Sequence, residues 1–336
     1  MNPLFDVAVI GATGLVGELL VELLDERDFP VGTLHVLAEG EAVGHSVPFK
    51  GKNLRVRDTA SFDFSQVRLV FFAEDPALAQ AYAERAGAAG CSLIDLSAGL
   101  DAALASPLVA EANGERLAAL AAPYRLRNPC APAILLSAVL APLRDSLSIR
   151  RLTLTACLAV SSRGREGVSE LARQTAELLN VRPLEPRLFG RQMAFNLLAE
   201  VDDADPAGHG QLERRLHDEL RVLLNAPDLE IAVTCIQVPV FFGDSLSVSL
   251  LAESPVDLPA IRAALDAADG IERVEEGDYP TVVGDAVGQD AIYVGRLRGG
   301  FTDPRELNLW IASDNVRKGA ALNAVQSAEL LIKHYL

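Results

Sequence analysis

The feature that most constrains how this 336-residue chain can fold is a glycine-rich turn close to its N-terminus. A short apolar run at residues 6–10 (DVAVI) leads into GATGLVG at residues 11–17, after which leucines recur at helical spacing. This order predicts a buried strand, a tight turn and an amphipathic helix.

Each glycine of this turn has a physical role. Gly11 lets the chain leave the strand sharply, Gly14 leaves room for a diphosphate to approach the backbone, and Gly17 lets the helix pack closely on the strand. The helix start adds free N–H groups and a positive dipole end, which favour an anion. The position of the turn between a strand and an amphipathic helix indicates dinucleotide-binding ancestry. Such turns also occur in α/β proteins that bind no nucleotide, so whether this chain binds one stays open. The predicted cofactor-binding residues of the turn are Gly11, Thr13, Gly14, Leu15, Val16 and Gly17.

A further candidate for this site is Glu39, which follows the expected strand at residues 33–38. It lies about twenty residues beyond the last glycine, where a dinucleotide-binding fold places a carboxylate on the adenosine ribose. The alternative is a solvated loop acid with no ligand.

The composition argues against several classes of function. The formal net charge of −16 disfavours a nucleic-acid partner or an anionic membrane surface. Asp6 interrupts the first apolar run, and no stretch approaches the roughly 18 apolar residues of a membrane span. We therefore expect a cytoplasmic protein. The four cysteines lack metal-ligand spacing, so neither a metal site nor a disulfide is expected.

The rest of the chain predicts an α/β protein with two domains. Strand and helix patterns alternate through the first part, which favours a parallel, Rossmann-type sheet. From about residue 152 the sequence pattern changes to strand-like runs with helical segments between them, which indicates an α+β domain with a mixed or antiparallel sheet. Residues 316–335 predict one amphipathic helix that returns to the first domain. The expected domains are residues 1–130 with 314–336, and residues 131–313.

Cys130 is the first candidate for chemistry, because it lies in a loop and opens a predicted helix at about Ala131. The helix dipole stabilises a thiolate at this position, which favours a nucleophile. The alternative is a buried structural cysteine.

Several segments, taken together and in order, resemble the aspartate-semialdehyde dehydrogenase family over nearly the whole chain. They are GATGLVG at 11–17, NPC at 128–130, VSSRGREGVSELARQT at 160–175, AFN at 194–196, VTCIQVPVFFGDS at 233–245 and DNVRKGAALNAVQ at 314–326. The resemblance implies a homodimer, NADP-linked reductive dephosphorylation of an acyl phosphate, and a thioester on Cys130. It also assigns Asn315 to the cofactor site.

The resemblance also shows which side chains of the family site are replaced. Gln237 stands where the family has the arginine that binds the substrate carboxylate, and Asp244 stands where it has the acid–base histidine. A charge-assisted hydrogen bond contributes roughly 1.5 to 3 kcal/mol against about 1 for a neutral one. An ionised Asp244 has no proton to give, and its charge beside Cys130 would raise the pKa of the thiol. A buried carboxyl with a raised pKa is the alternative.

Three further positions also lack the polar or cationic group of the family site. Leu158 replaces a glutamine, Asp101 lies near the position of a phosphate-binding arginine, and Glu39 with Gly40 takes the place of the groups that hold the NADP 2′-phosphate. NAD is therefore favoured over NADP. Glu74 and Asp75 follow a strand that normally meets the diphosphate through small residues, which disfavours either nucleotide.

Two main hypotheses follow from these replacements. The first is a divergent homodimer, resembling the family's catalytically divergent bacterial paralogues, that has lost or altered the dehydrogenase activity. The second is an active NAD(P)-dependent acyl or aldehyde oxidoreductase that acts through a Cys130 thioester on an altered substrate. A heterodimer with an active family enzyme is a third, weaker alternative.

Overall fold

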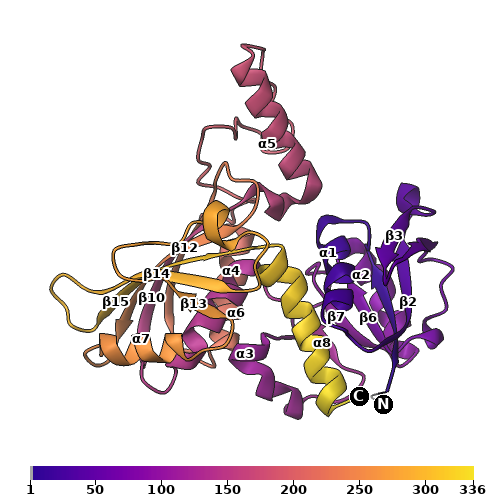
Figure 1. Ribbon diagram of the computed structural model, residues 1–336, viewed down its shortest axis with the longest axis horizontal. Helices are drawn as coiled ribbons and strands as arrows, with labels where there is room; N and C mark the ends of the chain where they lie inside the picture. Colours follow the sequence, from indigo (N-terminus) through magenta and orange to yellow (C-terminus); the bar gives the residue numbers. More distant parts are fainter. Residues whose placement is uncertain (1–2) are drawn as a thin grey trace. The chain divides into compact units, whose positions relative to one another are not determined.

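The computed structural model describes residues 3–336, which form two compact units (Figure 1). Unit 1 runs to Pro129 and takes up the chain again from Ala320 to its end. Unit 2 comprises Cys130–Gly319. The second boundary therefore lies between Gly319 and Ala320, whereas the sequence predicted it before Asp314.

Unit 1 is built on a seven-stranded sheet whose strands all run parallel, in the order β5-β2-β1-β6-β7-β9-β8. The central strands β1, β6 and β7 are mostly apolar and almost entirely buried, since both faces of a parallel sheet must be covered. The predicted Rossmann-type sheet is confirmed. Its strands are β1 (Phe5–Ile10), β2 (Val31–Ala38), β5 (Arg57–Asp58), β6 (Leu69–Phe72), β7 (Ser92–Asp95), β8 (Ser106–Pro107) and β9 (Arg125–Arg127).

The helices of unit 1 are α1 (Leu15–Glu26), α2 (Pro76–Ala88), α3 (Ala110–Asn113) and α8 (Asn323–His334). The C-terminal helix α8 packs beside α1, and an ion pair of 2.8 Å between Arg27 and Glu329 joins the two. A hairpin that was not predicted lies next to α1 and consists of β3 (Ser46–Phe49) and β4 (Lys52–Arg55).

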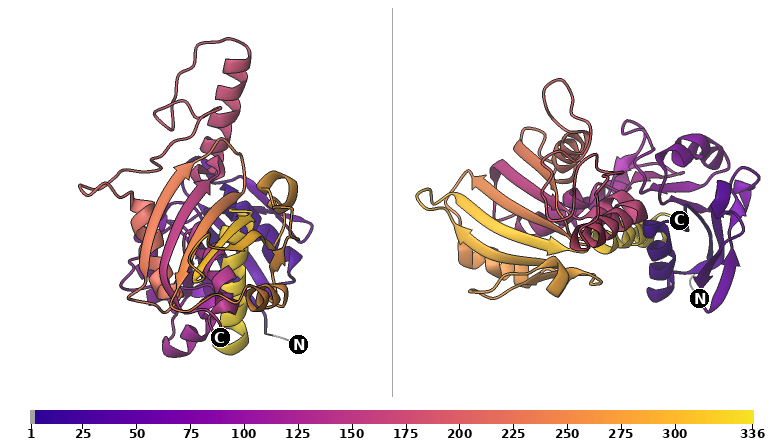
Figure 2. Two further views of the ribbon diagram at one scale, coloured as in Figure 1. Left: turned by 90° about the vertical axis from the view of Figure 1, so that its left-hand side faces the viewer. Right: turned by 90° about the horizontal axis from the view of Figure 1, so that it is seen from above.

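Unit 2 contains a mixed six-stranded sheet in the order β11-β10-β12-β15-β14-β13, which confirms the predicted α+β architecture. The pairs β10/β11 and β13/β14 are parallel, and the other neighbours are antiparallel. Helices α4 (Ala131–Leu140), α6 (Gln211–Leu223) and α7 (Leu258–Asp266) pack against this sheet (Figure 2). The strands are β10 (Ile149–Leu158), β11 (Glu230–Gln237), β12 (Asp244–Ala252), β13 (Ile271–Arg273), β14 (Ile292–Gly299) and β15 (Glu306–Ser313).

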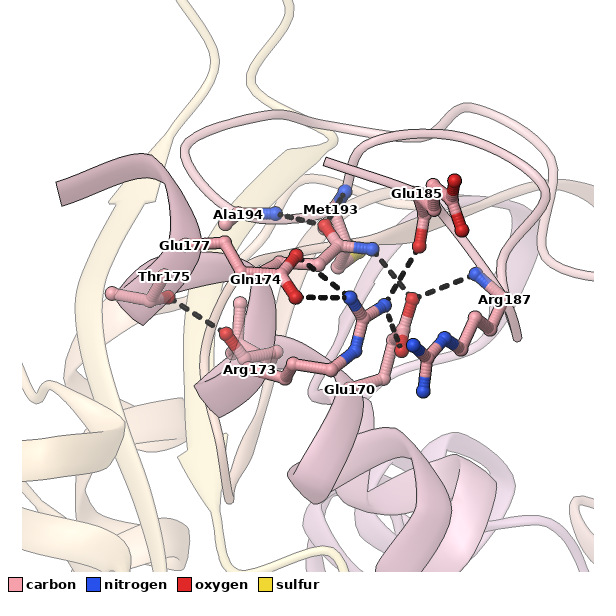
Figure 3. Close-up of polar contacts among 10 residues, drawn as sticks. Glu170, Arg173, Gln174, Thr175, Glu177, Glu185, Arg187, Met193 and Ala194 are labelled. Atoms are coloured by element: carbon pink, nitrogen blue, oxygen red, sulfur yellow. Dashed lines mark hydrogen bonds and ion pairs between the residues drawn. The ribbon is translucent and has the colours of Figure 1, made fainter. Parts of the chain in front are cut away.

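Helix α5 (Gly164–Leu179) and the segment after it project from the sheet of unit 2 (Figures 1 and 2). The buried carboxylate of Glu170 anchors this segment, because it accepts hydrogen bonds from Arg173 and Gln174 (both 2.7 Å) and from the backbone N–H of Arg187 (2.9 Å; Figure 3). The amide oxygen of Gln174 in turn accepts the N–H of Met193 at 2.7 Å. Although burial opposes it, these bonds lower the pKa of Glu170 to about 2.

The last predicted helix differs from the structure at its start. Residues 316–335 were expected to form one α-helix, but the segment begins as a π-helical turn, η7 (Arg317–Leu322), and becomes α-helical only from Asn323. Gly319 lies in this turn, and a Cβ there would come within 2.7 Å of the Ala131 side chain. The wider turn thus accompanies a close approach that the apolar periodicity does not encode.

Candidate functional site

The glycine turn of unit 1 has the geometry of a strand-to-helix turn. Gly11 has φ +82° and donates to the carbonyl of Leu37 at 2.9 Å, and α1 begins after Gly14. A Cβ on Gly17 would overlap the carbonyl oxygen of Gly11, so only glycine permits this packing of helix on turn. Thr13, Leu15 and Val16, the other residues predicted to bind a cofactor here, are half-buried.

Glu39 lies directly after β2 and is exposed, as expected for a residue that could reach a ribose. The hydroxyl of Tyr82 donates a hydrogen bond to its carboxylate. That bond raises the pKa of the Tyr82 hydroxyl. Glu39 is therefore held by a neighbouring side chain rather than solvated alone.

Cys130 occupies the predicted position, as the N-cap of α4 in unit 2. Its side chain is buried, and its backbone N–H donates to the Glu219 carboxylate at 2.8 Å. Glu219 is also buried, and Arg215 pairs with it at 2.7 Å. The first backbone donor of the helix therefore already has an anionic partner from α6.

The structure reverses the expected effect of α4 on the thiol. Burial raises the pKa of Cys130 well above its ordinary value, the negative charge of Glu219 raises it further, and Arg215 offsets this only in part. A thiol in this environment is protonated at neutral pH. The helix dipole, on which the sequence argument relied, is outweighed by desolvation and a nearby carboxylate.

Asp244 begins β12 and is fully buried, and it accepts a hydrogen bond from the backbone N–H of Ala159 at 2.9 Å. Burial raises the pKa of Asp244 to about 7; Asp314 raises it too, and the bond from Ala159 opposes both. The raised pKa favours the alternative that the sequence left open, a buried carboxyl that keeps its proton more readily than an exposed one, over a fully ionised carboxylate. The carboxylate that raises the pKa of Cys130 is Glu219 rather than Asp244.

Gln237 ends β11 and is buried, with its amide group tied to the neighbouring strand. Its Nε2 donates to the carbonyl of Leu158 at 2.7 Å, which fixes the orientation of the amide. Within residues 3–336, its Oε1 has no hydrogen-bond partner. The position thus offers an unused acceptor, which suits a donor group and not a carboxylate.

Asn315 lies in unit 2, and its amide oxygen accepts hydrogen bonds from the N–H of Gly243 (2.9 Å) and the hydroxyl of Ser161 (3.1 Å). It therefore ties the turn before β12 to the turn after β10. Asp244, Gln237 and Asn315 all lie where the ends of β10, β11, β12 and β15 meet, while Cys130 lies at the helix layer of the same unit.

Glu219 is a site residue that the sequence argument missed. A signal for it exists, because α6 buries Leu216, Glu219, Leu220 and Leu223, which are spaced three and four residues apart. An acid on the apolar stripe of an amphipathic helix needs a buried partner. Here the partners are the N–H of Cys130 and the guanidinium of Arg215.

No helix within residues 3–336 is long and apolar enough to cross a membrane. In the same residues, no group of three or more His, Cys, Asp or Glu side chains is placed to hold a metal ion.

Both units match domains of a known family. Residues 6–120 match the NAD-binding domain of semialdehyde dehydrogenases, and residues 140–318 match their dimerisation domain. The chain is 38% identical, over the full length of both proteins, to aspartate-semialdehyde dehydrogenase 2 of Vibrio cholerae. It belongs to the aspartate-semialdehyde dehydrogenase family. The dimerisation domain supports a homodimer, and the NAD-binding domain is present without showing which nucleotide is used.

Relatives of higher identity bear a different name from the enzymes. A USG-1 protein homolog of Pseudomonas aeruginosa is 61% identical over the full length of both chains, and one of Azotobacter vinelandii is 58% identical over 99% of both. The solved structure of a probable aspartate-semialdehyde dehydrogenase from Pseudomonas aeruginosa has a TM-score of 0.97 at 61% identity, and covers 99% of this chain and 100% of its own.

A structure of aspartate semialdehyde dehydrogenase II from Vibrio cholerae, complexed with ASA, also has a TM-score of 0.97, at 38% identity and full coverage of both chains. At 17% identity, the NADP-bound enzyme of Candida albicans still has a TM-score of 0.76 over 98% of each chain. That last likeness concerns the fold alone.

Proposed function

We propose that this chain is a homodimeric member of the aspartate-semialdehyde dehydrogenase family that no longer turns over the family's substrate. Its present role is binding, regulation or interaction through the retained fold. The observation that carries the proposal is the burial and hydrogen bonding of Gln237 and Asp244. Both are buried, and both form hydrogen bonds with the backbone at the end of β10, Gln237 with Leu158 and Asp244 with Ala159.

The replaced groups are those that the reaction needs. Attack on an acyl phosphate requires a thiolate, an acid–base group beside it, and cations for the carboxylate and phosphate. At the assigned positions this chain offers a thiol whose pKa is raised, an aspartic acid and a neutral amide. Loss of general acid–base catalysis alone costs roughly 10²- to 10⁴-fold in rate.

The nucleotide preference follows from Glu39 and Gly40. An exposed carboxylate after β2 accepts hydrogen bonds from ribose hydroxyls but repels a 2′-phosphate. Any nucleotide that binds is therefore NAD rather than NADP, and no metal takes part.

An active oxidoreductase with an altered substrate is the second candidate, and two observations favour it. Asp244, with a pKa of about 7, can both hold and release a proton at neutral pH. The unpartnered Oε1 of Gln237 would accept an N–H or O–H of a substrate that lacks the carboxylate. In this enzyme the Cys130 thiol would add to an uncharged aldehyde, and NAD would be the oxidant that accepts the hydride when the adduct becomes a thioester. A heterodimer with an active family enzyme is a further alternative for the partner.

The test is a turnover assay on the purified full chain. Aspartate semialdehyde, inorganic phosphate and either NAD or NADP are supplied, and nucleotide reduction is compared with that by the Vibrio cholerae relative. We expect a rate at least about a thousandfold lower, in the range that follows from losing the acid–base group and the cations. A rate within tenfold of the relative's would overturn the proposal, whereas turnover of an uncharged aldehyde would select the second candidate. Light scattering on the same sample tests the homodimer.

A further inference from the structure

Glu74 lies against the glycine turn of unit 1. The strand ends of β1 and β6 are adjacent, since Ala73 donates to the carbonyl of Ile10 at 2.9 Å, and Glu74 follows at once. A Cβ on Gly11 would lie 3.0 Å from the Cβ of Glu74 and 3.2 Å from its backbone nitrogen. The Glu74 side chain therefore starts in contact with the turn.

The carboxyl group of Glu74 fills the space that Gly14 leaves open. A Cβ on Gly14 would overlap the carboxyl carbon and both carboxyl oxygens of Glu74. In a dinucleotide-binding turn this glycine lets the diphosphate come close to the backbone. Here a side chain of the same protein takes that place.

A carboxylate is chemically suited to this position. Helix α1 begins just after Gly14, which is its N-cap and has no side chain that could accept a hydrogen bond from the first turn. Free N–H groups and the positive end of the helix dipole stabilise an anion at such a helix start. Glu74 supplies an anion that is covalently part of the chain and does not have to be captured from solution.

We propose that the Glu74 side chain occupies the diphosphate subsite of the glycine turn, and that it thereby disfavours the binding of both NAD and NADP to unit 1. Two effects act together. A diphosphate would overlap the Glu74 side chain, and its charges would stand beside a carboxylate. The inference rests on the proposed loss of turnover and supplies a cause for it within unit 1, independent of Cys130.

The neighbouring acids do not offer the same explanation. Asp75 caps α2 by accepting the N–H of Ala77 at 2.8 Å, so its carboxylate serves that helix. Glu39 is held by Tyr82 at the end of β2, where it opposes only the 2′-phosphate of NADP. Glu74 is the acid whose carboxyl group meets the position of Gly14.

The experiment measures NADH binding to the full chain by fluorescence, with ADP as a second ligand by calorimetry. Glu74→Ala removes bulk and charge, and Glu74→Gln removes the charge alone. Glu22→Gln is the control, because it removes one exposed carboxylate from helix α1, away from the turn. We expect Kd values for NADH and ADP at least tenfold lower with Glu74→Ala, a smaller decrease with Glu74→Gln, and no change with Glu22→Gln.

Three results would overturn the inference. They are micromolar NADH binding by the wild-type chain, no gain in either folded Glu74 variant, and an equal gain in Glu22→Gln. Thermal unfolding checks that each variant is folded, and if Glu74→Ala is not, the near-isosteric Glu74→Gln decides alone. Tight NADH binding without turnover would overturn this inference only, whereas turnover by the wild-type chain would overturn the proposed function.

Discussion

The carboxylate of Glu219 accepts the backbone N–H of Cys130 at 2.8 Å, so an anion from α6 lies at the helix start that would otherwise stabilise a thiolate. This contact changes the meaning of a cysteine at a helix N-terminus. The dipole of α4 is a fixed feature of the backbone, but its effect on the thiol depends on what else is buried beside it. Here burial and Glu219 both raise the pKa of Cys130.

The first prediction concerns the reactivity of Cys130. Iodoacetamide should alkylate it slowly at pH 7 and faster as the pH rises, because only the thiolate reacts. Glu219→Gln keeps an acceptor for the Cys130 N–H and removes the charge, so the pKa should fall and alkylation at fixed pH should speed up about tenfold for each unit of decrease. Peptide mapping by mass spectrometry follows Cys130 separately from the other three cysteines.

Asp218→Asn is the control for this measurement, since it removes an exposed charge from the same helix. Rapid labelling of Cys130 at pH 7 in the wild-type chain would contradict the raised pKa.

The second prediction concerns stability and the titration of Asp244. Its folded-state pKa of about 7 lies above the ordinary 3.8, so the folded chain keeps a proton that the unfolded chain releases. The stability from this group is present below about pH 4 and is lost as the pH rises through 7. Asp244→Asn should therefore gain stability relative to wild type between pH 4 and pH 8, by up to about 4 kcal/mol. Denaturant unfolding at both pH values measures the gain, and a constant difference would show that Asp244 does not titrate in this range.

The third prediction concerns the segment that Glu170 anchors. Its pKa of about 2 lies below the ordinary 4.5, so its contribution is present above about pH 4.5 and is lost as the pH falls towards 2. Glu170→Gln should weaken the bonds to Arg173 and to the N–H of Arg187, at a cost of about 2 kcal/mol at neutral pH. Hydrogen exchange at residues 185–196 should accelerate.

Glu177→Gln is the matched control, because Glu177 also pairs with Arg173 at 2.7 Å yet is more exposed than Glu170. Equal acceleration in both variants would assign the effect to Arg173 and not to the buried carboxylate.

The fourth prediction concerns restoration of turnover. Gln237→Arg, Asp244→His and Leu158→Gln together should bring back measurable dehydrogenase activity if side chains alone are missing. Adding Glu74→Ala should lower the KM for the nucleotide and leave the other three changes to act on kcat. Steady-state kinetics with aspartate semialdehyde and NAD measure both. A folded quadruple variant without activity would mean that the positions assigned from the resemblance are not the ones the chemistry uses.

The sequence predicted the elements whose pattern is local. The glycine spacing and the apolar periodicity of α1 follow one another directly in the chain, and together they predicted the start of the unit 1 fold. Cys130 lies at the helix start where it was expected. Strands β13 to β15 were not predicted, because β14 and β15 mix charged, polar and apolar residues and their pairing is set by distant partners.

The electrostatics of the candidate site could not be predicted from the sequence for a related reason. The pKa of Asp244 depends on complete burial and on Asp314, some seventy residues later in the chain. The role of Glu219 depends on α6 packing against α4. Both are properties of tertiary packing, and a motif comparison records only which residue type is present.

The close contact between Gly17 and the carbonyl of Gly11 has a consequence for how such chains are recognised. Two of the three glycines are required by the backbone itself, for a left-handed torsion and for a helix lying on its own turn. A descendant that abandoned its ligand would have to keep them in order to fold. The glycine pattern then persists because the fold requires it. Whether a nucleotide can still bind is better judged from the side chain that packs against the turn from the neighbouring strand, here Glu74.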